Sequence, residues 1–187
     1  MKIIPTVSIA AVALAATIGL AGCQSAPPEA TPSLTSTAST SNVLPVDKNP
    51  IVNASVSPGL ELVSAAAEDN IDPLTQQPIT DRLQITLKNT SDHDLSNFDV
   101  YYSMTDISTG QSEGYYQALS GFVLKAGETQ TIAFDNETKP GHYPENSFSL
   151  YRSSTNQVDF AIEVSAGGVQ IARGTATKSV GTGEKAD

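Results

Sequence analysis

The sequence predicts an all-β fold, an antiparallel β-sandwich of about seven strands that follows a disordered linker. Three observations lead to this expectation. From about residue 60 onward, apolar and polar residues alternate with a period of two. Short runs of turn-forming residues separate the alternating segments. No segment of comparable length carries the 3.6-residue apolar stripe of an amphipathic helix.

Each expected strand repeats the same pattern over a few residues. In 98–105, the side chains of Phe98, Val100, Tyr102 and Met104 fall on one face. One apolar face per strand is typical of an antiparallel sheet that covers a core on one side. In chain order, the strands are expected at 60–62, 83–88, 98–105, 129–134, 148–151, 158–165 and 169–178.

Two segments leave alternatives open. Residues 51–56 could add an edge strand, and residues 65–67 could begin a short helix that 69–73 would end. Residues 114–117 are expected to connect two strands. The expected turns lie at 89–92, 108–110, 126–127, 139–141, 153–156 and 167–168. Because each sheet has one apolar face to bury, two sheets are expected to pack face to face.

The composition changes along the chain in a way that predicts four segments. Residues 1–22 form a signal peptide, 23–59 a linker, 60–178 the sandwich and 179–187 a disordered tail. The linker begins with a run rich in Ser, Thr, Ala and Pro, which cannot bury enough apolar surface to offset the entropy of ordering. As a coil, it would have an r.m.s. reach of about 30–36 Å.

The N-terminus indicates export. Lys2 is followed by an uncharged apolar and small-residue run that ends in Leu20-Ala21-Gly22-Cys23. This tetrapeptide resembles the lipobox of bacterial lipoproteins. The resemblance implies cleavage between Gly22 and Cys23, a diacylglyceryl group on the Cys23 thiol and acylation of the new amine, for instance with palmitate. Two or three acyl chains anchor a protein stably, at about 0.8 kcal/mol per buried methylene. An ordinary transmembrane helix or a plain secreted protein is the alternative.

Charge and cysteine content exclude several classes of function. The 187-residue chain has 10 basic and 20 acidic side chains, a net charge of -10. An acidic chain is a poor partner for nucleic acid and lacks the basic patch that binds anionic lipid surfaces. The membrane contact is therefore expected through the lipid on Cys23, at the extracytoplasmic face of the cell membrane. A lone cysteine forms no internal disulfide.

Two segments carry a family resemblance. Residues 83–100 combine an alternating strand, Asn-Thr-Ser-Asp at a turn and a second strand, and residues 124–134 combine Leu, a turn Gly and an apolar strand. Together with 148–151, they resemble the immunoglobulin-like domains of bacterial envelope lipoproteins, particularly actinobacterial ones. The resemblance spans about residues 80 to 178 and implies an immunoglobulin-like sandwich. It implies no activity, because such folds host unrelated functions.

Candidate chemistry is sparse in the sequence. It contains no nucleophile elbow, P-loop, dinucleotide-binding glycine pattern, HExxH or paired CxxC. His93 lies beside two aspartates in a turn, and His142 lies in a Pro-Gly loop. His93 could act as a general base oriented by a neighbouring carboxylate, and the two histidines could form a metal pair only if their turns meet in space. An acidic loop with Glu68, Asp69 and Asp72 lacks the EF-hand pattern. No catalytic residue, metal site or cofactor is predicted.

Four tyrosines are the best candidates for a binding surface. Tyr101, Tyr115, Tyr116 and Tyr143 are expected outside the core, where tyrosine supplies rigid contact area at low entropic cost. Alternatively, these rings cap the ends of the sandwich. The sequence thus predicts a non-enzymatic binding or scaffold module of the cell envelope, whose partner is another envelope protein or cell-wall glycan. The alternative is an envelope hydrolase or a metal-binding or metal-delivery lipoprotein that uses the two histidines.

Overall fold

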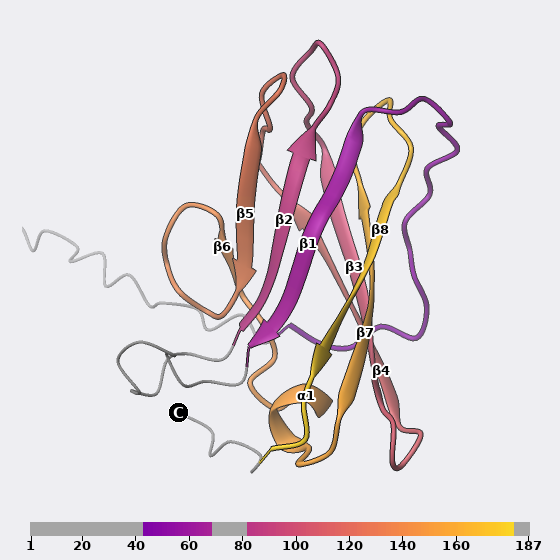
Figure 1. The fold of residues 1–187 in the computed structure, drawn as a ribbon, viewed down its shortest axis with the longest axis vertical. Coiled ribbons are helices and arrows are strands. Elements are labelled where there is room, and N and C mark those ends of the chain that lie inside the picture. Colours follow the sequence, from indigo (N-terminus) through magenta and orange to yellow (C-terminus); the bar gives the residue numbers. More distant parts are fainter. Residues whose placement is uncertain (1–42, 69–81, 182–187) are drawn as a thin grey trace, which may run out of the picture. The chain divides into compact units, whose positions relative to one another are not determined.

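The protein is built from two packed β-sheets (Figure 1). A computed structural model describes residues 43–68 and 82–181, which belong to one compact unit. The first sheet has the order β1-β2-β5-β6, with strands Leu60–Glu68, Arg82–Asn89, Thr129–Phe134 and His142–Tyr143. The second has the order β4-β3-β7-β8, with strands Ser112–Leu119, Phe98–Asp106, Val158–Ser165 and Ala172–Lys178.

The connections between strands give an immunoglobulin-like arrangement. Strands β3 and β4, and strands β7 and β8, are sequential antiparallel pairs, whereas the chain changes sheet between β2 and β3 and between β4 and β5. The orders β1-β2-β5 and β4-β3-β7-β8 correspond to the A-B-E and C′-C-F-G orders of such sandwiches. The predicted all-β sandwich is confirmed. No helix in the described residues is long and apolar enough to cross a membrane.

The core lies between the sheets, where the alternation places it. Along β3, every second residue from Phe98 to Asp106 is buried. Tyr102 of β3 meets Phe134 of β5 across the sandwich, with ring centroids 5.3 Å apart. Each buried large apolar side chain contributes about 1.5–3 kcal/mol relative to an exposed one, so this layer dominates the stability of the fold.

Two local predictions were wrong. Residues 114–117 belong to strand β4 and do not form a connection. The strand was missed because two consecutive buried residues, Gly114 and Tyr115, break the alternation there. Residues 148–151 do not form a strand: α1 spans Leu150–Ser153, and Phe148 before it is 73% exposed. The alternative left open at 65–67 is decided for a strand, because these residues lie within β1 and not in a helix. Neighbouring small residues permit either structure, and pairing with β2 selects the strand.

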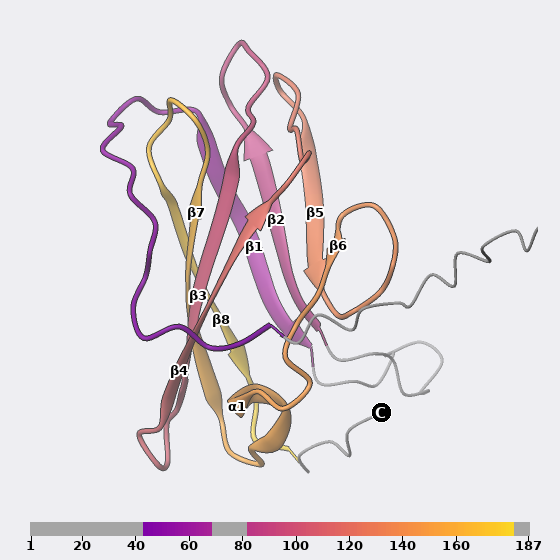
Figure 2. The same cartoon turned by 180° about the vertical axis from the view of Figure 1, so that it is seen from behind.

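Residues 43–59, here called the strap, differ from the expected linker. The strap forms no strand at 51–56, yet it lies on the outer face of the second sheet and then runs beside β7 towards β1 (Figure 2). Its backbone amide at Val46 donates to Gly114 O at 2.7 Å. Farther along, Asn49 donates to Glu163 at 2.8 Å, and Asn53 donates to Ser165 Oγ at 2.8 Å. These long-range bonds make the strap part of the folded unit.

The remaining predicted segments fall outside the described residues. These include the signal peptide with Gly22, the acylation site Cys23, the linker up to residue 42 and the tail from residue 182. The folded unit therefore begins no later than Val43 and includes the seventeen residues 43–59 that were expected in the linker.

Candidate functional site

The candidate site is formed where strand β5 ends and the chain turns back. Asp135 follows Phe134 directly, and its Oδ1 accepts the Glu137 backbone N–H at 3.0 Å, which closes a tight Asx turn. The chain then returns as β6, which pairs in parallel with β5 so that His142 lies beside Ala133. The Ala133 N–H donates to Gly141 O at 2.9 Å. Backbone pairing thus fixes both ends of the loop.

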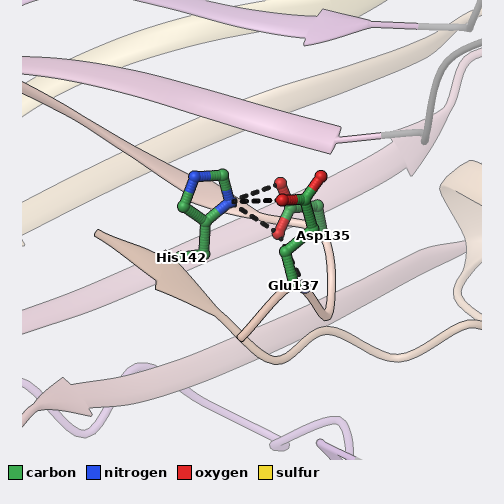
Figure 3. Close-up of side chains that lie close together, drawn as sticks. All are labelled: Asp135, Glu137 and His142. Carbon is green, nitrogen blue, oxygen red and sulfur yellow. Dashed lines mark hydrogen bonds and ion pairs between the residues drawn. The ribbon is translucent and has the colours of Figure 1, made fainter. Parts of the chain in front are cut away.

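Three ligating side chains converge at this point (Figure 3). His142 Nδ1 lies 2.8 Å from Asp135 Oδ2 and 3.1 Å from Asp135 Oδ1. Glu137 Oε2 lies 3.9 Å from the same ring nitrogen. Asp135 is buried, whereas His142 and Glu137 keep about a quarter to a third of their side chains exposed. We call Asp135, Glu137 and His142 the acidic–imidazole cluster.

Basic side chains balance the charge of the cluster. Lys139 Nζ forms an ion pair with Glu137 Oε2, and it is the main reason why the pKa of Glu137 is lowered and that of Lys139 is raised. The charges of His142 and Arg82 lower the pKa of Glu137 further. Glu137 is therefore held as a carboxylate at neutral pH, next to the buried carboxyl group of Asp135.

An open groove lies beside the cluster. Its volume is about 440 Å³, and its walls are residues 120–123 from the connection after β4, Gln130 from β5 and residues 139–143. His142 belongs to both the groove wall and the acidic–imidazole cluster. Lys139 lines the groove and forms an ion pair with Glu137 of the cluster. A second groove, of about 300 Å³, is lined by residues 96–99 and 118–123 and shares the wall at 120–123. The connection at 120–123 thus separates two adjoining hollows.

The cluster can perform two kinds of chemistry. When Nδ1–H donates to Asp135, the imidazole is held in one orientation and Nε2 is left as an acceptor, the arrangement of an oriented general base. When Nδ1 is deprotonated, the ring and the two carboxylates offer one nitrogen and two oxygen ligands to a cation.

The two predicted histidines do not meet. His93 follows β2 in the turn before β3, where Asn89 Nδ2 donates to His93 O at 2.7 Å. Asn89 is at the opposite end of β2 from Leu83, which pairs with Phe134 next to the cluster. His93 is 62% exposed, and within the part of the chain that the structure describes it pairs with its neighbour Asp92 alone, at 3.0 Å. A site that uses both histidines is therefore not formed by this fold.

The four predicted tyrosines do not form one surface, and Tyr115 was predicted wrongly. It is 0% exposed, it stacks on Tyr102 with centroids 5.6 Å apart, and its hydroxyl donates to Glu113 at 2.7 Å. Burial is the main cause that raises the pKa of Tyr115, with the bond to Glu113 next, so the phenol stays a donor. Tyr115 is a core residue.

The other three tyrosines are partly exposed, two on the second sheet and Tyr143 on the first. Tyr101 and Tyr116 pair across β3 and β4 on the outer face of the second sheet. Tyr116 donates to Asp99 at 2.7 Å, and the Tyr101 ring lies over Gly114, where a Cβ would come within 2.7 Å of the Tyr101 hydroxyl. Only Tyr143 lines the groove, with its ring 5.8 Å from that of Phe134.

Asp135 and Glu137 were missed by the sequence reasoning. The available signal was the spacing Asp-x-Glu followed five residues later by His142, directly after an apolar strand. That spacing is ambiguous without the knowledge that 142–143 pair with β5. Of the predicted acidic loop, Asp69 and Asp72 lie outside the described residues.

Comparison with known proteins adds no family. No protein-family model and no curated protein matches the sequence. Among solved structures, β-glucuronidase 2 of Bacteroides uniformis matches at 12% identity and TM-score 0.35, over 66% of this chain and 13% of that one. The DNA glycosylase AlkC of Pseudomonas fluorescens matches at 19% identity and TM-score 0.31, over 64% and 30%. Spo0M of Bacillus subtilis matches at 11% identity and TM-score 0.31, over 66% and 50%.

The chain thus spans between 13% and 50% of the length of these three proteins. Similarity at this level transfers neither activity nor substrate to the chain.

Proposed function

We propose that the protein is a lipid-anchored, extracytoplasmic binding module of the cell envelope, without enzymatic activity. The anchor is Cys23, within the lipobox 20–23, and the binding element is the immunoglobulin-like sandwich. Because the strap belongs to the folded unit, only residues 24–42 separate the lipid from the sandwich. If those residues behave as the coil that their composition predicts, the sandwich stands about 22–26 Å from the anchored residue.

The observation that carries the binding function is the groove beside the cluster. Its walls combine apolar side chains, Val123 and Tyr143, with hydrogen-bonding side chains, Gln130 and Lys139. A concave surface of this composition is typical of a recognition site. Its partner is another envelope protein rather than glycan. Sugar stacking needs an exposed ring face, and the two aromatic rings of the groove, Phe122 and Tyr143, pack against the core.

A matched pair of valines provides the test. A photo-crosslinking residue is placed at Val123 in the groove or at Val63 on β1, which are 45% and 49% exposed. In intact cells, irradiation is expected to give a discrete protein adduct from position 123 and none from position 63. Equal adducts from both positions, or a glycan adduct at 123, would contradict the proposed partner.

A second function, metal binding, was also an alternative from the sequence, and one observation favours it. The acidic–imidazole cluster brings three possible ligand atoms within 4.8 Å of one another without any contribution from His93.

A further inference from the structure

We propose that Asp135, Glu137 and His142 form a binding site for one divalent transition metal ion of the zinc class. The site is independent of the lipid anchor and adds a ligand to the proposed binding module. It uses three side chains from one short segment, with the first and last held by the pairing of β5 with β6.

The geometry suits such an ion. Zinc binds imidazole nitrogen at about 2.0–2.1 Å and carboxylate oxygen at about 2.0–2.2 Å, so tetrahedral ligand atoms stand roughly 3.4 Å apart. Here His142 Nδ1 is 2.8 Å from Asp135 Oδ2 and 3.9 Å from Glu137 Oε2. These separations bracket the required value, and all three atoms lie within 4.8 Å of one another. The third separation, between the Asp135 and Glu137 oxygens, is at most 4.8 Å, so it has to close by about 1.4 Å or less to complete the three-ligand set.

The ligands are positioned before any ion binds. Asp135 is 3% exposed, and its carboxylate is oriented by the Glu137 backbone N–H at 3.0 Å. The Asp135 N–H donates to Tyr143 O at 3.1 Å, which fixes Asp135 next to His142. A preformed set of ligands lowers the entropic cost of binding, because few rotamers have to be restricted.

The charge balance permits exchange of a side-chain cation for a metal ion. Lys139 is 68% exposed and reaches Glu137 from the surface, so its ion pair contributes little stability, about 0–1 kcal/mol. A metal ion can displace this ammonium group at small cost. The positive charges of Lys139 and Arg82 near Glu137 also oppose a cation, so a modest affinity is expected.

The donor set selects the class of metal. One imidazole and two carboxylates, with no thiolate among them, suit Zn²⁺ better than Cu⁺. Ca²⁺ needs six to eight oxygen ligands, more than this cluster offers. Water molecules from the groove that His142 lines would complete the coordination.

The test is titration of Zn²⁺ into the full chain, purified without an affinity tag and carrying Cys23→Ser, so that no thiol or tag competes. Calorimetry is expected to show one zinc ion per chain. His142→Gln and Glu137→Gln should each weaken binding roughly tenfold or more, since each removes a ligand. His93→Gln removes the other imidazole–carboxylate pair of the described residues and should leave binding unchanged.

Absence of saturable binding to the parent chain would overturn the proposal, and so would an equal loss in His93→Gln and His142→Gln. Glutamine at position 142 can donate its amide N–H to Asp135, so the loop should stay closed, and thermal unfolding without zinc checks this. X-ray absorption of the zinc complex provides an independent readout. One imidazole with oxygen neighbours supports the site, whereas two or more imidazoles contradict it.

Discussion

The placement of Tyr115 in the core can be tested directly against a surface role. The structure buries the ring completely between the sheets, stacked on Tyr102. Its hydroxyl donates to Glu113 at 2.7 Å and accepts a bond from Asn146 Nδ2 at 3.1 Å. Replacement of Tyr115 by Ala is therefore expected to act on stability and not on any contact with a partner.

The magnitude follows from these contacts. Truncation of a large buried aromatic side chain to Ala costs about 3–5 kcal/mol, because apolar transfer energy is lost and a cavity remains. Tyr115→Phe keeps the ring and loses the hydroxyl's bonds to Glu113 and from Asn146, of which the bond to the Glu113 carboxylate alone corresponds to about 1.5–3 kcal/mol. Tyr116, partly exposed in the next position of β4, serves as the control: it loses only a part-buried bond to Asp99 and little buried ring surface, so Tyr116→Ala should cost about 1.5 kcal/mol or less.

Urea unfolding followed by far-ultraviolet circular dichroism measures all three variants on one scale. The expected order of destabilisation is Tyr115→Ala, then Tyr115→Phe, then Tyr116→Ala. If Tyr115→Ala keeps the urea midpoint of the parent protein while Tyr116→Ala lowers it, the assignment of the core face of β4 is refuted.

Two further predictions concern the strap and the pH dependence of stability. Asn53→Ala removes the strap's bonds to Ser165 Oγ and Val169 O, at 2.8 and 2.9 Å, and should cost about 1–3 kcal/mol. It should also speed hydrogen exchange at 43–59; unchanged exchange there would show that Asn53 does not hold the strap. Hydrogen bonds, first from Ser154 and then from Asn156, lower the pKa of the Asp106 carboxyl group. The stability that Asp106 adds to the fold is therefore fully present well above the unfolded pKa of about 3.9, and it is lost as the pH falls through the folded pKa. Unfolding measured from pH 6 to pH 2 should therefore show a smaller acid loss in Asp106→Asn than in the parent, and equal losses would contradict this.

The sequence predicted the strands that have one buried face and missed the elements that depart from that pattern. In β3, buried and outward side chains alternate without interruption, so period two identifies both the strand and its core face. In β4, Gly114 and Tyr115 are buried in succession, and the glycine makes room for the Tyr101 ring from the neighbouring strand. That requirement belongs to a tertiary contact, which local periodicity does not contain.

The strap and α1 were missed for related reasons. The strap is held by side-chain amides, Asn49 and Asn53, that bond to groups more than a hundred residues away. Composition alone makes such a segment look like a linker. In α1, Leu150 and Tyr151 are both buried, a pattern that departs from the period-two alternation used to predict a strand there and that a helical turn accommodates.

The candidate site was predicted only in part. His142 was singled out from its residue type, but its partners were not, because they become neighbours only when β6 pairs with β5. His93 has the more suggestive sequence context, flanked by two aspartates, yet it lies exposed in a turn. Adjacent charges in a turn remain in solvent, whereas charges on either side of a closed loop are brought together.

The central claim is that an exported sandwich is fixed to a membrane through one sulfur atom. Mass spectrometry of the intact protein from its native membrane tests it most directly. The account predicts a chain that starts at Cys23 and carries the added mass of a diacylglyceryl group, with or without a further acyl chain. A chain that retains residues 1–22, or one that starts elsewhere with an unmodified thiol, would contradict it.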